Sequence, residues 1–159
     1  MKIGVVSDTH NNLKNIETIV SLFNREDVEL VIHTGDITND VSLQKFSKLN
    51  CNFCGVYGNN DRNEIGLKEY VEENGLKFKE PPFLIHESKR NIAIFHEPDS
   101  IEDFLSANRN VDIVLHGHTH RYRKDIQNDT LIYNPGESAG MSSGKNAIGI
   151  ITLEHLYES

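Results

Sequence analysis

Histidines and carboxylates gather at a few short points of this chain. The pentapeptide at 116–120, HGHTH, carries three of the eight histidines found among 159 residues. Asp8 and His10 stand two residues apart, and His96 follows an apolar run. Imidazole and carboxylate side chains bind divalent metal ions, and they also act as acids and bases. A metal site, a pH switch and a chance grouping are therefore all open at this point.

Polar side chains follow five of the strands that the apolar runs predict. The runs end at residues 6, 32, 57, 95 and 115, and the polar segments behind them are SDTH (7–10), HTGD (33–36), GNND (58–61), His96 and HGHTH (116–120). In α/β sheets, ligands bind at the carboxyl ends of the strands. Five strand ends therefore bring carboxylates, imidazoles and an amide toward one edge of the predicted sheet.

The mixture of side chains indicates which ions such an edge would bind. Asp, His and Asn together suit Mn²⁺, Zn²⁺, Fe²⁺, Ni²⁺ or Co²⁺. The lack of thiolates argues against a structural zinc site. Asp8 and His10 would share one face of an extended segment, and so would His118 and His120. Seven candidates are too many for one ion and suit two ions that share a carboxylate, the arrangement that stabilises phosphoryl transfer.

The spacing of apolar residues predicts the elements that must position these side chains. Residues 13–23 form one helix, capped by Asn11 or Asn12, and Val41 to Leu49 support a weaker helix. Strands at 3–6, 28–32 and 53–57 alternate with these helices, which favours a mostly parallel sheet. The remaining predictions are an exposed helix and loop at 63–82, a hairpin of 83–86 with 91–95, a short helix from Asp99 or Ser100, and strands at 111–115, 122–127, 131–133 and 147–153.

Composition limits the class of protein. With 159 residues, 37% of them hydrophobic and 25% charged, the chain is predicted to be one globular domain, residues 1–159. No apolar run approaches the ~20 residues that span a membrane, and no signal peptide is evident, so we expect a cytoplasmic protein. The net charge of −8 argues against an extended nucleic-acid surface but allows a small phosphorylated substrate. Cys51 and Cys54 are expected to be ordinary thiols on opposite faces of a strand.

Taken in order, these segments resemble one known family. Asp8-Thr9-His10, Gly35-Asp36, Gly58–Asp61, His96 and Gly117–His120 follow the pattern of the calcineurin-like metallophosphoesterase superfamily. The chain looks most like its small single-domain branch of bacterial and archaeal phosphodiesterases, which includes the retromer-subunit relatives. Asn134-Pro135-Gly136 also fits this branch. The resemblance implies an α/β fold in which a two-sheet β-sandwich is flanked by helices in four αββα layers.

The resemblance also implies a role for each matched residue. One ion would be held by Asp8, His10, Asp36 and His120, and the other by Asp36, Asn59, His96 and His118, with Asp36 as the bridge. A hydroxide between the ions would attack phosphorus, with Asn59, Asn60 and His96 as the catalytic residues. Mn²⁺ is the first choice of cofactor, followed by Ni²⁺, Co²⁺, Zn²⁺ or Fe²⁺. His116 is left out of the ligand set, and His33 is a candidate to support a ligand from behind.

Two departures from the family pattern affect the expected chemistry. Asn60 stands where many members carry a histidine that protonates the leaving group or holds the phosphate. An amide is no general acid near pH 7, so we expect better turnover of esters whose leaving groups need no protonation. Glu97-Pro98 follows His96 where glycine is common, and the glutamate either adds charge beside the second ion or points outward.

Two functions from different classes remain. The first is a metal-dependent phosphoesterase, a phosphodiesterase more than a monoesterase, acting on a small phosphate ester. The alternative is a catalytically weak or inactive metal-binding scaffold for protein–protein interaction, as the retromer relatives suggest. A scaffold would be free to lose ligands, and the complete set of seven favours the enzyme. No membrane partner is expected, and a homo-oligomer is possible because small members of this branch often associate.

Overall fold

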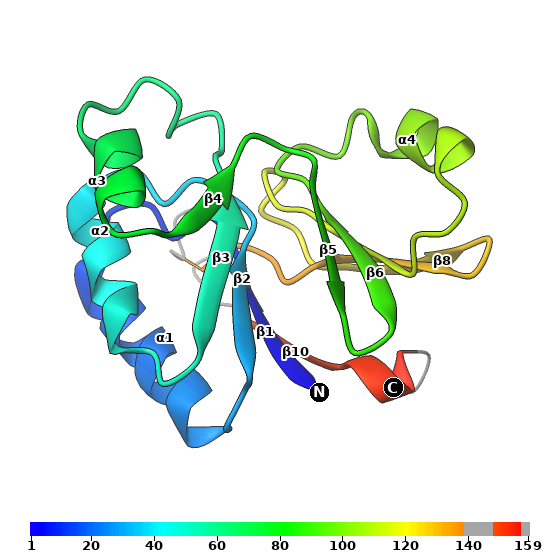
Figure 1. The fold of residues 1–159 in the computed structure, drawn as a ribbon, viewed down its shortest axis with the longest axis horizontal. Helices are drawn as coiled ribbons and strands as arrows, with labels where there is room; N and C mark the ends of the chain where they lie inside the picture. The colour runs from blue at the N-terminus through cyan, green and yellow to red at the C-terminus, as the bar shows by residue number, and fades with distance from the viewer. Residues whose placement is uncertain (139–147, 157–159) are drawn as a thin grey trace.

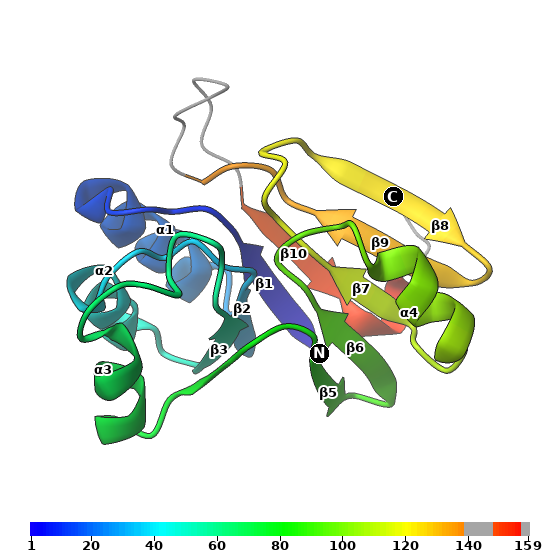
Figure 2. The same cartoon turned by 90° about the horizontal axis from the view of Figure 1, so that it is seen from above.

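Two five-stranded sheets face each other in the computed structural model, which describes residues 1–138 and 148–156. Sheet A has the strand order β10-β1-β2-β3-β4, and sheet B has the order β5-β6-β7-β9-β8. Helices α1, α2 and α3 lie outside sheet A, and α4 lies outside sheet B (Figure 1). The view from above shows the resulting helix–sheet–sheet–helix order (Figure 2). The predicted αββα sandwich is confirmed.

Sheet A follows the alternation of strands and helices predicted for the first half of the chain. Its strands β1, β2, β3 and β4 are parallel, and β10 runs antiparallel to β1. The bounds are β1 Lys2–Val6, β2 Leu30–His33, β3 Asn52–Val56, β4 Lys77–Lys79 and β10 Gly149–Thr152. The strand predicted at 147–153 is thus present over its central part, while Ala147 lies outside the described residues.

The first two crossovers of sheet A are the helices predicted around residues 13–23 and 41–49. Helix α1 spans Leu13–Arg25, and the Asn12 side chain accepts a hydrogen bond from the Asn15 amide at its start. Helix α2 spans only Asp40–Lys45 and continues as the 3-10 helix η1, Phe46–Lys48. Val41 was predicted to lie on the buried face of this helix. That prediction is wrong, because Val41 is 44% exposed.

The segment 63–82 contains more structure than an exposed helix and loop. Helix α3, Leu67–Glu73, buries Leu67 and Val71, and β4 then pairs with β3 as the edge strand of sheet A. The prediction missed β4 because it has only three residues, of which Phe78 alone is apolar and buried. Lysines on either side of Phe78 keep this edge polar, which suits an unpaired strand edge.

Sheet B contains the predicted hairpins and the short helix. Strands β5 and β6 meet at a turn where Ser88 and Lys89 both have positive φ. Ser100 occupies the N-cap position of α4 but makes no capping side-chain hydrogen bond. The bounds are β5 Phe83–Glu87, β6 Arg90–Ile94, α4 Ile101–Ala107, β7 Ile113–Leu115, β8 Arg123–Gln127 and β9 Thr130–Asn134.

The core lies mainly between the two sheets. Ile3, Val5 and Ile32 of sheet A pack in one cluster with Ile94 and Leu115 of sheet B, all of them fully buried. Burial of apolar surface on both faces fixes the sheets relative to each other. The strand ends above this core are therefore held in a defined position.

Both cysteines are free thiols on opposite sides of sheet A, as predicted. Cys54 packs in the core between the sheets, whereas Cys51 packs against the cluster under the helices. Within residues 1–138 and 148–156, no helix is long and apolar enough to cross a membrane.

Candidate metal centre

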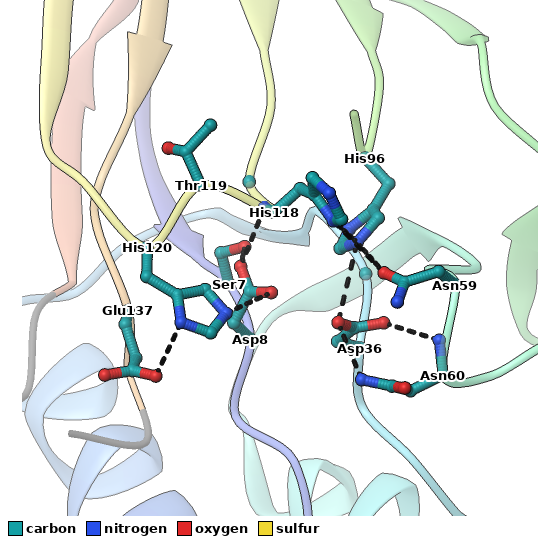
Figure 3. Close-up of polar contacts among 12 residues, drawn as sticks. Ser7, Asp8, Asp36, Asn59, Asn60, His96, His118, Thr119, His120 and Glu137 are labelled. Atoms are coloured by element: carbon teal, nitrogen blue, oxygen red, sulfur yellow. Dashed lines mark hydrogen bonds and ion pairs between the residues drawn. The ribbon is translucent and has the colours of Figure 1, made fainter. Parts of the chain in front are cut away.

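The carboxyl ends of five strands meet at one edge of the sandwich, where all seven predicted ligands lie. Sheet A supplies Asp8 and His10 after β1, Asp36 after β2 and Asn59 after β3. Sheet B supplies His96 after β6, followed by His118 and His120 after β7. Six of them, all but His10, are labelled in Figure 3, where their side chains gather in one place. The seven are Asp8, His10, Asp36, Asn59, His96, His118 and His120.

The backbone at five of the seven ligands is left-handed rather than extended. Asp8 has φ 53° and His10 has φ 50°, so the predicted extended segment is wrong, although both side chains reach the same group. His118 has φ 70° and His120 has φ 61°, so the segment that carries this second pair is not extended either. Non-glycine residues in this region cost about 1–3 kcal/mol each, and such strain clusters at functional sites. Asp and His tolerate this conformation better than most residues.

Hydrogen bonds between loops hold this strained backbone in place. The Asp8 amide donates to the Gly35 carbonyl at 3.0 Å, and the His10 amide donates to the Asp36 carbonyl at 2.9 Å. The loop after β1 is thereby tied to the loop after β2. The two carboxylates of these loops, Asp8 and Asp36, are 0% and 2% exposed.

Asp8, His10 and His120 form the first group that could hold an ion. Their ligand atoms all lie within 4.8 Å of one another. Asp8 Oδ2 accepts hydrogen bonds from the Ser7 hydroxyl and from the His118 amide. Its Oδ1 faces His120 Nε2 at 3.4 Å and has no hydrogen-bond partner in the part of the chain that the structure describes. Burial raises the pKa of Asp8, although the hydrogen bond from Ser7 acts in the opposite direction.

Asp36, Asn59, His96 and His118 form the second group. His96 Nε2 lies 3.5 Å from Asp36 Oδ2 and 2.8 Å from Asn59 Oδ1. His118 Nδ1 lies 3.2 Å from Asn59 Oδ1 and 3.3 Å from His96 Nε2. His96 Nδ1 lies 2.8 Å from the Thr34 carbonyl, which only accepts hydrogen bonds. His96 Nδ1 therefore donates to this carbonyl, and Nε2 is the ring nitrogen that faces the group.

Asp36 lies between the two groups. Its ligand oxygen lies within 4.8 Å of the ligand oxygen of Asp8 and of the ligand nitrogen of His96. Asn60 points at the same carboxylate: its backbone amide donates to Oδ1 at 2.9 Å, and its side-chain amide donates to Oδ2 at 3.1 Å. Asn60 therefore orients Asp36 in this structure, in addition to the predicted role toward the substrate.

Asp61 fixes the backbone beneath Asp36. It is fully buried, and its Oδ2 accepts hydrogen bonds from the amides of Asp36 and Gly58, each at 2.8 Å. Its Oδ1 accepts from the Thr38 amide at 2.7 Å. Burial raises the pKa of Asp61, and these amide hydrogen bonds offset part of that effect. The last residue of the GNND segment is thus a brace between the loops after β2 and β3.

Glu137 is the residue of this centre that the sequence analysis missed. Its side chain is 0% exposed, and Oε2 lies 2.9 Å from His120 Nδ1 (Figure 3). Glu137 follows the carboxyl end of β9, a strand that was predicted at 131–133. The rule used for the other strand ends, applied to this strand as well, would have found it.

The other residues discussed beside the ligands lie outside the two groups. His33 is buried behind the loops, where Nε2 lies 2.9 Å from Thr9 Oγ1 and Nδ1 accepts from the Gly35 amide at 3.0 Å. Burial lowers the pKa of His33 to about 3. His116 is also buried, and burial lowers its pKa as well. The Glu97 carboxylate faces Arg62, with Oε1 3.8 Å from the guanidinium. Of the two orientations considered for Glu97, beside the second ion or outward, the structure has the outward one.

The donor set fits divalent ions. Ligand atoms about 2.1 Å from one ion lie roughly 3–3.5 Å from each other, and acceptor atoms of both groups face one another at 3.3–3.5 Å. Among the described residues, His10 Nε2, like Asp8 Oδ1, is a buried polar atom with no hydrogen-bond partner. Buried polar atoms are otherwise nearly always paired, so these two atoms mark a place for a cation.

The fold and the site agree with a single protein family. Residues 1–155 match the model of the calcineurin-like phosphoesterase superfamily domain. The chain belongs to this family. A phosphodiesterase of Methanocaldococcus jannaschii is 36% identical over 157 residues, which cover 97% of this chain and 94% of that protein. A probable metallophosphoesterase of the same organism is 32% identical over 138 residues, covering 86% of this chain and 67% of the relative.

Solved structures show the same relationship. The structure of an archaeal phosphodiesterase matches with a TM-score of 0.87 and 35% identity, covering 97% of this chain and 94% of the other. Vps29 of Entamoeba histolytica, solved in complex with Zn²⁺, matches with a TM-score of 0.71 and 18% identity, covering 96% and 86%. At this identity the second match shows a shared fold only. The resemblance predicted from the ordered motifs is confirmed.

Proposed function

We propose that this member of a phosphoesterase family is a phosphodiesterase that uses two divalent metal ions. The observation that carries the proposal is that two ligand groups adjoin: the ligand atom of buried Asp36 lies within 4.8 Å of Asp8 in the first group and of His96 in the second. The M. jannaschii relative, which aligns over nearly the whole chain, is named a phosphodiesterase. In this proposal, Asp8, His10, Asp36 and His120 hold one ion, whereas Asp36, Asn59, His96 and His118 hold the other.

The ions would supply a hydroxide nucleophile at neutral pH and neutralise the charge that builds up on the phosphate. The protein's part is to hold the ligands in the correct protonation state and to orient the ester. Asn59 contributes an amide whose oxygen already faces His96 and His118. Its amide nitrogen is then available to donate a hydrogen bond to a phosphate oxygen.

The leaving group would receive little help from this site. Asn60 donates to Asp36 and has no proton to transfer near pH 7. We therefore expect a preference for esters with acidic alcohols as leaving groups. Mn²⁺ is the proposed cofactor because a set of carboxylate, imidazole and amide ligands suits a fairly hard ion.

A hydrolysis assay on the purified chain tests this function. The protein is treated with a chelator, and Mn²⁺, Ni²⁺, Co²⁺, Zn²⁺ or Mg²⁺ is then added back in separate reactions. Bis(4-nitrophenyl) phosphate and 4-nitrophenyl phosphate serve as an activated diester and an activated monoester. We expect activity to return with the metal and to be higher on the diester. No metal-dependent hydrolysis of either compound would overturn the enzyme and favour the scaffold.

A further inference from the structure

We propose that Glu137 is a positioning residue that sets the tautomer of His120 and makes the Asp8–His10–His120 group the tighter of the two metal sites. The inference rests on the proposed function, since it concerns metal binding at the same centre. It adds a residue outside the predicted ligand set and an order in which the two sites fill.

The tautomer follows from the contact between the two side chains. Glu137 Oε2 lies 2.9 Å from His120 Nδ1, and the glutamate side chain is completely buried. A carboxylate accepts hydrogen bonds and does not donate them. Oε2 lies at ion-pair distance from Nδ1 rather than in hydrogen-bond geometry. The negative charge of the carboxylate therefore favours a proton on Nδ1 and leaves Nε2 to bind an ion. That atom is the one that faces Asp8 Oδ1, at 3.4 Å.

The loop that carries Glu137 is fixed against the loop of Asp8. The Ser138 amide donates to the Ser7 carbonyl at 2.9 Å, and the Ser138 hydroxyl accepts from the Ser7 amide at 3.3 Å. The residue on either side of this contact is a member of the proposed site: Asp8 follows Ser7, and Glu137 precedes Ser138. The position of the carboxylate relative to the first group is thus set by the backbone.

The same loop is also fixed against the segment of His120. Buried Asn134 donates from its side chain to the Gly117 carbonyl at 3.3 Å and to the Thr119 hydroxyl at 3.1 Å. Its side-chain oxygen accepts from the Gly136 amide at 2.9 Å. Gly136 has φ 93°, a conformation that glycine adopts without strain. Glu137 and His120 therefore sit on segments that cannot shift independently.

The two sites differ in what stands behind their imidazoles. His120 has the Glu137 carboxylate, whereas His96 has the neutral carbonyl of Thr34. A carboxylate behind a histidine makes the imidazole a stronger ligand, and it adds a negative charge close to the ion. The neutral carbonyl orients His96 without adding that charge. The first group is therefore expected to bind a divalent cation more tightly than the second.

Calorimetric titration of the chelator-treated full chain with Mn²⁺ tests this inference. We expect two binding steps in the wild type. Glu137→Gln keeps an oxygen acceptor but loses the charge, and Glu137→Leu loses both. Removing such a partner typically weakens metal binding 10- to 100-fold, so we expect the tight step to weaken about 10-fold in the first variant and about 100-fold in the second. The weaker step keeps its affinity.

Two controls separate this effect from general damage. Glu73→Gln removes an exposed carboxylate from α3 and should leave both steps unchanged. The ¹⁵N chemical shifts of the His120 ring, measured without metal, should report a proton on Nδ1 in the wild type and lose that preference in Glu137→Leu. A variant that merely disturbs the fold would weaken both binding steps, and this result would overturn the inference.

The outcomes also separate this inference from the proposed function. A wild type that binds no Mn²⁺ overturns both. A wild type that binds two ions, together with Gln and Leu variants that bind them equally tightly, overturns the role of Glu137 and leaves the two-metal enzyme standing.

Discussion

The two sheets contribute different chemistry to the centre. Sheet A supplies oxygen ligands, Asp8, Asp36 and Asn59, and one imidazole, His10. Sheet B supplies imidazoles alone. Each proposed ion is held by residues from both sheets, so neither sheet contains a complete site. The centre therefore depends on the packing of the core between the sheets as much as on the ligands themselves.

The supporting contacts differ between the sheets in the same way. The carboxylates of sheet A are surrounded by donors, such as the Asn60 amide at Asp36 and the Ser7 hydroxyl at Asp8. Two imidazoles of sheet B face acceptors: His96 faces the Thr34 carbonyl, and His120 faces Glu137. Donors keep the oxygens in place, and acceptors keep a proton on the far nitrogen. Both arrangements prepare the ligand atoms for a cation.

Removing the carboxylate between the two groups should have the largest effect. We expect Asp36→Ala to lower kcat/KM for bis(4-nitrophenyl) phosphate by at least about 1000-fold, because both ions lose a ligand worth several kcal/mol in the transition state. Asp103→Asn, on the exposed face of α4, serves as the control and should retain wild-type rates. Near-normal rates in Asp36→Ala would show that the carboxylate of sheet A is not required.

Two neighbouring histidines of sheet B should respond differently to substitution, because His118 is a proposed ligand and His116 is a core residue. His118→Ala is expected to lower kcat/KM by about 100-fold and to remove one Mn²⁺ per chain, because it deletes a ligand. His116→Ala should bind two ions but lose about 1–3 kcal/mol of stability, since His116 is 1% exposed and Nδ1 lies 3.0 Å from the Gly117 carbonyl. Metal content and chemical denaturation measure the two effects. The reverse pattern would exchange the roles of the two residues.

Metal should stabilise the packed pair of sheets. Each ion at 100 times its dissociation constant adds about 2.7 kcal/mol to the free energy of unfolding. Two ions together then add about 5.4 kcal/mol, so for a chain of this size we expect Mn²⁺ to raise Tm by roughly 10–20 °C. Scanning calorimetry with chelator and with excess Mn²⁺ measures the shift. Asp36→Ala should show a smaller shift, and equal shifts in both proteins would place the stabilising ion elsewhere.

Acid should weaken sheet A through His33, which binds no ion in this account. Burial lowers the pKa of His33 to about 3, so below about pH 6.5 the unfolded chain binds a proton that the folded chain excludes. Stability is therefore lost as pH falls, by about 2 kcal/mol from this residue between pH 7 and pH 5. Urea unfolding of His33→Gln at the two pH values should show a loss smaller by that amount. Exposed His86→Gln should keep the wild-type difference.

A smaller effect is expected at the leaving group. Asn60→His introduces an imidazole that can donate a proton near pH 7. We expect the ratio of kcat/KM for an alkyl diester to that for an activated aryl diester to rise about 10-fold, while the rate on the aryl diester changes little. An unchanged ratio would indicate that residue 60 acts only through Asp36.

The sequence predicted the ligands better than their surroundings. Every ligand follows a strand, and a strand end can be located from apolar runs without knowing the fold. The left-handed backbone at Asp8 and His118 could not be predicted, because it depends on hydrogen bonds between loops that are distant in sequence. Glu137 follows a predicted strand and could have been included as a candidate, but its contact with His120 appears only when the end of β9 is placed beside β7.

Short and edge elements were the weak part of the fold prediction. The strand β4 has three residues and is recognised only by its pairing with β3. Val41 has the type and spacing of a core residue but lies on the solvent-exposed side of α2. In both cases the tertiary environment, rather than the local pattern, decides the outcome.

The most direct test of the central claim is anomalous X-ray diffraction from crystals of the chain soaked in Mn²⁺. The account predicts two peaks about 3.5–4 Å apart between the sheets, with Asp36 contacting both. One peak should lie among Asp8, His10 and His120, and the other among Asn59, His96 and His118. A single peak held by one sheet alone, or peaks away from these residues, would contradict it.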